Sequence, residues 1–238
     1  MKERPILFQG AMVRAILDGS KTQTRRIMKP QPEPNPNRSG DHWWPCNAFQ
    51  SMLSVSETRA PGAHGMAGDA CPYGAHGDRL WVRESYRFTD AFNTDSPARV
   101  AERCLDAGYR SPWAPTHYEA DCARRDWKHV GTPPHDGVPK AGKVRPSIHM
   151  PRWACRILLE IVSVRVERLQ DISEPDARDE GITDGGCVCC GDPEPCGCPN
   201  PSPDARDAYC ALWESINGAG SWAANPWVWV VEFKRVAP

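Results

Sequence analysis

The stretch KTQTRR at residues 21–26 places one amine, two hydroxyls and two guanidinium groups within six residues. In a strand, Thr22 and Thr24 would point to one side and Lys21 and Gln23 to the other. A turn ending at Lys21 would relax this alternation and bring its amine near the Thr24 hydroxyl, as in a lysine-activated nucleophile. The alternative is a solvated basic edge strand, where Lys, Arg and Thr are common.

A second group of reactive side chains consists of five cysteines within residues 187–198. Thiolates bind zinc in tetrahedral sites, and the Gly and Pro residues between these cysteines supply tight turns. Cys187 and Cys190 form a C-x-x-C pair, and Cys196 and Cys198 complete a set of four, which leaves Cys189 over. We therefore predict a structural zinc site, with a mobile thiol-rich loop and a redox site as the alternatives.

Composition limits the classes of partner. The net charge is −1, so no global positive field attracts nucleic acid or anionic membranes, and any nucleic-acid site must be a local patch. The N-terminal residues lack the apolar run and cleavage site of a secretory signal, and no apolar segment is long enough to span a bilayer. We expect a cytoplasmic protein without a membrane partner, whose eleven cysteines are thiols or metal ligands. Without Walker or dinucleotide glycine motifs, no organic cofactor is expected.

Apolar spacing predicts the elements around the basic run. Residues 5–9 favour a strand, and residues 11–17 favour a helix that ends at Gly19. The basic run would follow this helix as the next strand. The chemistry proposed for Lys21 and Thr24 therefore depends on a helix, a turn and a strand that follow one another directly.

A strand is also predicted within residues 79–88, RLWVRESYRF, where Leu80 and Val82 form a core face. The other face presents Arg79, Trp81 and Arg83. Aromatic rings and guanidinium groups are the usual platform for unpaired bases, so this face is a candidate nucleotide contact. In the alternative interpretation, Trp81 packs beneath another element.

The C-terminal half contains four further predicted elements. Residues 154–169 favour one strand or two strands joined at Ser163. Residues 173–182 favour a short helix with a capping box at its start and a stop at Gly181. Glu180 lies at the far end of this helix, where the helix dipole disfavours a carboxylate. A helix over 204–216 and a buried strand over 227–233 follow. Strands and short helices without regular alternation predict an α+β fold with a mixed sheet or barrel.

Pro- and Gly-rich composition marks three insertions, at about residues 30–76, 106–147 and 184–203. Loops of this length are uncommon in a compact domain. The first insertion also contains five large apolar side chains, which argue that part of it packs onto the body of the protein. These are Trp43, Trp44, Phe49, Met52 and Leu53.

Five segments together resemble the ASCH domain (activating signal cointegrator homology) in its phage and prophage form. They are PILFQGAMVRAILDGSKTQTRR, GDRLWVRES, SIHMPRWACRILLEI, ERLQDISEPDARDEGI and PWVWVVEFKR. The resemblance implies a single domain over residues 1–238 with a PUA-like fold, a small mixed β-barrel with flanking helices, interrupted by the insertions. It also implies a protein of a bacterial host cell whose cleft takes RNA or a modified nucleoside.

Compact bacterial proteins of this family hydrolyse the amide of N4-acetylcytidine with a Lys, a Thr and a Glu. The family's K-T-x-T motif matches Lys21 and Thr24, with Arg26 at a following Arg, and the helix glutamate matches Glu180. The resemblance thus implies that Lys21 takes the proton of Thr24, that Thr24 attacks the acyl carbon, and that Glu180 orients the amine or handles the leaving-group proton. Arg26 would stabilise the oxyanion.

The expected function is therefore amidohydrolysis of an N4-acylated cytidine. Two alternatives use the same basic cleft, namely a non-catalytic module that binds single-stranded RNA or a modified nucleoside, and a ribonuclease. The expected substrate-binding side chains are Thr22, Arg26, Arg79, Trp81 and Arg83.

Overall fold

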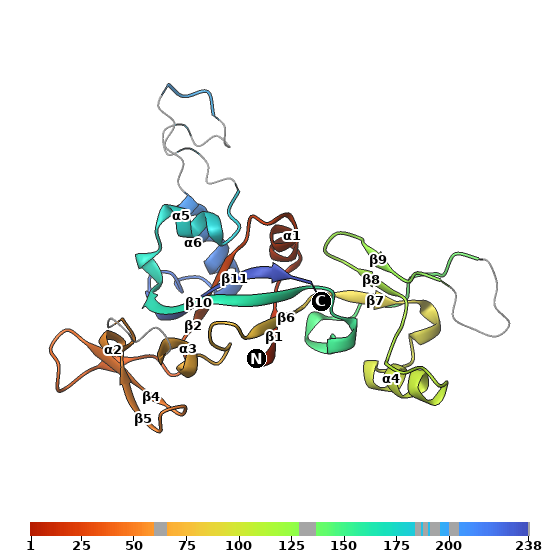
Figure 1. The fold of residues 1–238 in the computed structure, drawn as a ribbon. Coiled ribbons are helices and arrows are strands. Elements are labelled where there is room, and N and C mark those ends of the chain that lie inside the picture. The colour runs from red at the N-terminus through yellow and green to blue at the C-terminus, as the bar shows by residue number, and fades with distance from the viewer. Residues whose placement is uncertain are drawn as a thin grey trace. The chain divides into compact units, whose positions relative to one another are not determined.

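A computed structural model gives the fold of the chain (Figure 1). It describes residues 1–59, 66–128, 137–183, 187, 190, 196–199 and 205–237. The chain divides into two compact units. The first comprises residues 1–2, 15–79 and 160–234, and the second comprises residues 3–14, 80–159 and 235–238.

Both units mix helices and strands. The first contains β2 (Gln23–Ile27), β3 (Glu33–Pro34), β4 (His42–Cys46), β5 (Ser51–Ser54), α2 (Val55–Arg59), α3 (Met66–Ala70), η4 (Leu169–Asp171), α5 (Glu174–Asp179) and α6 (Ala205–Asn217). The second contains β1 (Glu3–Leu7), β7 (Tyr86–Phe88), η1 (Asp90–Phe92), α4 (Pro97–Asp106), β8 (Thr116–Tyr118), β9 (Arg124–Arg125), η2 (Ser147–His149) and η3 (Arg152–Ala154). Four elements have residues in both, namely α1 (Gly10–Asp18), β6 (Arg79–Arg83), β10 (Leu158–Arg168) and β11 (Trp227–Val236).

The strands form three sheets, with orders β1-β6-β10-β11-β2, β3-β4-β5 and β7-β8-β9. These orders confirm the predicted α+β class. None of the three sheets in the described part of the chain closes into a barrel, so the PUA-like barrel is not confirmed. Within the residues that the structure describes, no helix is long and apolar enough to cross a membrane.

The strand that carries the basic run is held in register by its neighbour. Strand β2 pairs antiparallel with β11, and Thr24 lies opposite Val231 while Arg25 lies opposite Val230. The β11 residues Trp227 to Val231 are all buried, as the continuous apolar run predicts. This pairing fixes the position of the KTQTRR segment along the sheet.

A hydrophobic cluster in the first unit packs α5, α6 and the start of β11 together. Burial of apolar surface is the main force that holds these elements in place. Its buried members are Leu169, Ile172, Ala177, Ala205, Tyr209, Trp213, Val228 and Val230.

The short helix α5 begins and ends as its sequence predicts. The Ser173 side chain accepts from the Asp176 backbone N–H, and the Asp176 side chain accepts from the Ser173 N–H, which completes the capping box. The helix ends at Asp179, Glu180 caps it, and Gly181 follows the cap with a φ of +92°. A Cβ at this glycine would lie 3.0 Å from the Ala15 Cβ and 3.2 Å from the Lys21 Cβ. Glycine therefore permits both the backbone turn and the close approach of Lys21 to the end of α5.

The first insertion is more ordered than its composition predicts. It holds the β3-β4-β5 sheet together with α2 and α3. Trp44 is buried and packs edge-on against Trp229, and Leu53 is also buried. Phe49 and Met52 are exposed, so only part of the predicted apolar set faces the core.

The second unit has its own hydrophobic cluster beside the β7-β8-β9 sheet. The predicted strand at residues 79–88 is in fact two strands, β6 and β7, and the helix α4 was not predicted. The buried members of the cluster are Tyr86, Phe88, Phe92, Val100, Ala114, Tyr118, Met150 and Ala154.

Candidate active site

Lys21 is buried in the first unit, between the end of α1 and the end of α5. Its backbone N–H donates to the Ala15 carbonyl at 2.9 Å, and its backbone bridges to that of Glu180. The side chain is fully buried, and its Nζ lies 2.6 Å from Glu180 Oε2 and 2.8 Å from the Glu180 carbonyl oxygen. Removal from water lowers the pKa of Lys21, and the adjacent Glu180 carboxylate opposes this shift without cancelling it.

Glu180 follows the last residue of α5 and holds the C-cap position. Its side chain is only 3% exposed. A carboxylate at a helix C-terminus is disfavoured by the dipole, so cations must compensate it. Lys21 and Arg25 both do so, because Arg25 Nη1 lies 3.4 Å from Glu180 Oε1.

Arg25 extends this pair into a buried network. Its Nη2 lies 2.5 Å from Glu167 Oε1 and 3.3 Å from Asp176 Oδ2. Arg165 in turn lies 2.9 Å from Asp176 Oδ1 through its Nη2 and also pairs with Glu232. Fixed charges therefore surround the Lys21–Glu180 pair and hold its carboxylate in one position.

Tyr209 on α6 brings a hydroxyl to the same pair. Burial raises the pKa of Tyr209 well above its normal range, and the neighbouring Glu180 carboxylate, which the hydroxyl approaches as a hydrogen-bond partner, raises it further. The phenol therefore stays protonated and can donate at neutral pH. Helices α5 and α6 are joined at their starts as well, because Glu174 Oε1 and Oε2 each accept from the Ala205 N–H at 2.9 Å.

The remaining residues of the basic run lie on or beside β2. Thr24 is buried, Arg26 is half-buried, and Thr22 is exposed. Strand alternation assigns Gln23 and Arg25, which both contact α5, to one face of β2, and assigns Thr24 and Arg26 to the other. Lys21 lies two positions before Gln23, and its side chain contacts Glu180, the residue that caps α5, so alternation does not by itself place Thr24 on the side of Lys21.

The predicted Arg-Trp-Arg stripe is divided between the units. Arg79 belongs to the first unit, and Trp81 and Arg83 belong to the second. The Arg83 guanidinium carbon lies 5.4 Å from the centroid of the Trp81 ring, and Arg83 also donates to the Ile148 carbonyl. Both Trp81 and Arg83 are half-buried. A role of these side chains in substrate binding stays a prediction.

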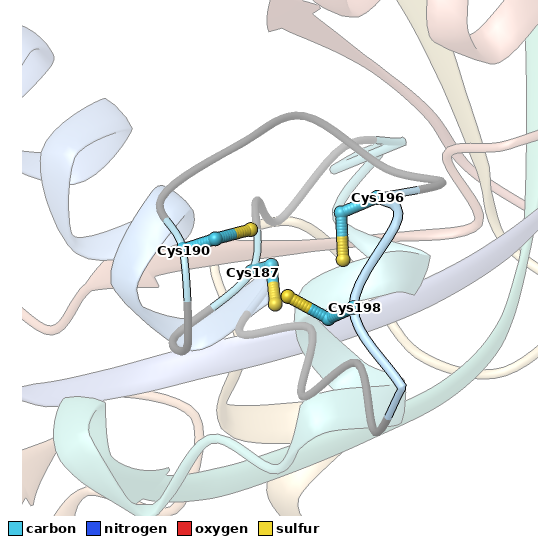
Figure 2. Close-up of side chains that lie close together, drawn as sticks. All are labelled: Cys187, Cys190, Cys196 and Cys198. Atoms are coloured by element: carbon cyan, nitrogen blue, oxygen red, sulfur yellow. The ribbon is translucent and has the colours of Figure 1, made fainter.

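The four cysteines chosen from the sequence lie together, as Figure 2 shows with their sulfur ends turned toward a common centre. The sulfurs of Cys187, Cys190, Cys196 and Cys198 all lie within 4.8 Å of one another. Such a cluster could bind a metal ion. Cys189, the fifth thiol of the run, lies outside the described residues.

No family model, no curated protein and no solved structure matches this chain.

The sequence indicates Lys21 and Glu180 but not the side chains that surround this ion pair. Arg25, Glu167, Asp176 and Tyr209 were not expected at the site. These residues meet only through tertiary packing, since Arg25 is 142 and 155 positions from Glu167 and Glu180. The one local signal is alternation, because Lys21, Gln23 and Arg25 lie two positions apart and all contact α5 or the residue that caps it.

Proposed function

We propose that this protein is an ASCH-like amidohydrolase that removes the acyl group of N4-acetylcytidine or a similar substrate, with Lys21, Thr24 and Glu180 as its catalytic residues. The observation that carries the proposal is the buried Lys21–Glu180 pair. The sequence resemblance singles out these two residues, which are 159 positions apart, and their charged atoms lie 2.6 Å apart. A buried lysine with a lowered pKa next to a carboxylate is typical of functional sites.

The proposed reaction needs a lysine that can lose its proton. Neutral Lys21 accepts the proton of the Thr24 hydroxyl while the Thr24 oxygen bonds to the acyl carbon. The bond from the acyl carbon to N4 then breaks, N4 takes the proton from Lys21, and cytidine leaves. Water hydrolyses the acyl-threonine ester and releases the acid. Glu180 orients the amine, and Arg26 stabilises the oxyanion.

The experiment compares two valine substitutions at buried threonines. Thr24→Val preserves shape and removes the proposed nucleophile, so it should abolish acetate release from N4-acetylcytidine while leaving cytidine binding intact. Thr89→Val is the matched control, because Thr89 is equally buried, lies in the second unit, and has a hydroxyl with no hydrogen-bond partner among the described residues. Its rate should equal that of the wild type.

Two results would contradict the proposal. One is a wild-type protein that binds cytidine but releases no acyl group from any N4-acylated cytidine, which would favour a binding module. The other is a Thr24→Val variant that retains the wild-type rate, which would remove Thr24 from the reaction.

We further propose that the cysteine cluster holds one structural zinc ion. Four thiolates at zinc–sulfur distances of about 2.3 Å lie about 3.8 Å apart in a tetrahedron, which fits the spacing of these sulfurs within 4.8 Å. Four thiolate ligands leave no open position for catalysis, so the role is structural. Elemental analysis should give about one zinc per chain. Cys196→Ser with Cys198→Ser should remove it, and Cys122→Ser, at an exposed thiol of the second unit, should not.

A further inference from the structure

The first unit contains a cavity that the proposed reaction does not use. Its volume is about 460 Å³, and Trp227 at the start of β11 forms part of its wall. The other lining residues are Ser39 to His42 from the first insertion and Val55, Ser56 and Arg59 on α2. Its size lies in the range of cavities that bind small ligands.

Two guanidinium groups lie over the Trp227 ring. The guanidinium carbon of Arg168 is 4.4 Å from the ring centroid, and that of Arg59 is 5.9 Å from it. The His42 ring lies 5.2 Å from the same ring, centroid to centroid. Stacking of this kind holds a guanidinium plane in place and leaves its N–H edge available.

Hydrogen bonds fix the backbone of Trp227, whose ring lies under the two guanidinium groups. The Trp227 backbone N–H donates to Gln31 Oε1 at 2.8 Å, and its carbonyl accepts from the Met28 N–H at 3.0 Å. Trp227 is 7% exposed, and its indole Nε1 has no acceptor among the described residues. A residue that lines the cavity thus carries a buried donor without an acceptor among the described residues.

Neither arginine is neutralised by a carboxylate in the part of the chain that the structure describes. Arg59 donates from Nε and Nη2 to the Val166 carbonyl, at 3.3 and 2.9 Å. Arg168 donates from Nη1 to the Asn225 carbonyl at 3.0 Å, and its Nη2 lies 3.4 Å from His42 Nε2. Because a guanidinium has five N–H donors, each arginine keeps donors for a ligand.

The acidic group in the lining, Asp41, is already occupied. Its Oδ1 accepts from the His42 N–H at 2.8 Å and from the Ser56 N–H at 3.2 Å, and its Oδ2 accepts from the Ser56 hydroxyl at 2.6 Å. These bonds fix the wall of the cavity. They also leave Arg59 in the lining with donors still available to a ligand, and Arg168 lies next to the lining, over the Trp227 ring and beside His42.

We propose that this cavity binds the phosphate group of a nucleotide or of single-stranded RNA, with Arg59 and Arg168 as the phosphate ligands. Planar guanidinium groups bind phosphate through paired N–H donors, and both guanidinium groups lie over the same Trp227 ring. The residues that line the cavity come mainly from the first insertion, so the proposed site depends on that insertion.

The test measures binding without hydrolysis and therefore stands apart from the proposed reaction. Cytidine, cytidine 5′-monophosphate and a short single-stranded RNA are titrated into the full-length protein by calorimetry. Arg59→Gln and Arg168→Gln should each weaken binding of a phosphorylated ligand by about tenfold or more, and cytidine binding should not change. Arg99→Gln is the control, because Arg99 is an exposed arginine of the second unit paired with Glu102.

The two phosphate sources give different results, and both support the site. If the substitutions weaken the binding of both cytidine 5′-monophosphate and RNA, the cavity accepts a terminal phosphate. If only RNA binding weakens, the ligand is an internal phosphate of a strand, and the salt dependence of RNA binding should become less steep. Thermal unfolding checks that the variants fold, and Arg59→Lys should recover part of the affinity because it keeps the charge.

The proposal is overturned if neither phosphorylated ligand binds the wild-type protein. It is also overturned if both glutamine variants, shown to be folded, bind these ligands as tightly as the wild type, or if Arg99→Gln weakens binding equally.

Discussion

Each unit of the protein buries a cluster of ion pairs, and the two clusters differ in one chemical property. The first unit has Lys21 and Glu180, with Arg25 beside them. The second has Arg156 with Glu84 and Asp121. In both, the central carboxylate is almost fully buried, with 3% of the Glu180 side chain and 2% of the Glu84 side chain exposed.

The second cluster has the geometry of a structural brace. Arg156 Nε and Nη2 each lie 2.8 Å from a Glu84 oxygen, and its Nη1 and Nη2 lie 2.9 and 2.8 Å from the Asp121 oxygens. The guanidinium also lies over the Tyr118 ring, 4.0 Å from its centroid. An arginine cannot lose its proton at accessible pH, so the cation of this cluster keeps its charge.

The first cluster contains a cation that can change charge. Lys21 is a buried amine whose pKa is lowered by removal from water, while Arg25 supplies the fixed charge next to it. A buried ion-pair cluster that only stabilises the fold can use an arginine as its cation, as the second unit does. The presence of a buried lysine in the first unit is therefore the feature that points to chemistry.

The largest effect on stability is expected from Arg156→Met in the second unit. This change leaves the Glu84 carboxylate buried without its cation, which typically costs about 3–5 kcal/mol. Denaturant unfolding followed by circular dichroism measures the loss. A loss below about 1 kcal/mol, the value of an exposed ion pair, would mean that the cluster is not a brace.

An intermediate effect is expected at alkaline pH, from the tyrosine beneath this brace. Burial raises the pKa of Tyr118 to about 12. The unfolded chain ionises first, near pH 10, so stability is intact below pH 10 and falls as the pH rises toward 12, by about 3 kcal/mol at most.

Unfolding free energies measured from pH 9 to 12 for the wild type and Tyr118→Phe test this expectation. The phenylalanine variant should lose part of the pH dependence. Tyr86, whose pKa burial also raises to about 12, should account for a further part. Identical curves for the wild type and the variant would show that Tyr118 ionises normally in the folded protein.

The smallest effect on stability is expected from replacing the Lys21–Glu180 pair as a whole. Lys21→Met with Glu180→Leu removes both buried charges, and such replacements are often neutral or stabilising, so the change should stay within about 1.5 kcal/mol. Activity should nevertheless be lost. A destabilisation above about 3 kcal/mol would instead make this pair a second brace.

The sequence predicts those elements whose signals are local. The capping box at Ser173, the glycine stop at Gly181 and the apolar strand at the C-terminus all follow from short patterns. Helix α4 also carries such signals, since Ser96 caps it and Pro97 occupies its first turn, but it was not predicted.

Long-range packing accounts for what the sequence could not reveal. Strand β4 contains Pro45, which argues against a strand, yet Trp44 is held there by Trp229, 185 positions away in the sequence. The partners of Arg25 have no local signature either. For the candidate site, the resemblance supplied Lys21 and Glu180, and only the structure supplied the charges around them.

The most direct test of the central claim is the pH dependence of acetate release from N4-acetylcytidine by the wild-type protein and by Lys21→Arg. If Lys21 is the base, the wild-type rate should rise with pH as the amine loses its proton, and it should do so below the usual lysine range because the pKa of Lys21 is lowered. Lys21→Arg should show no such rise, since a guanidinium keeps its proton. Acetate release by Lys21→Arg at the wild-type rate, or no release by the wild type at any pH, would contradict the account.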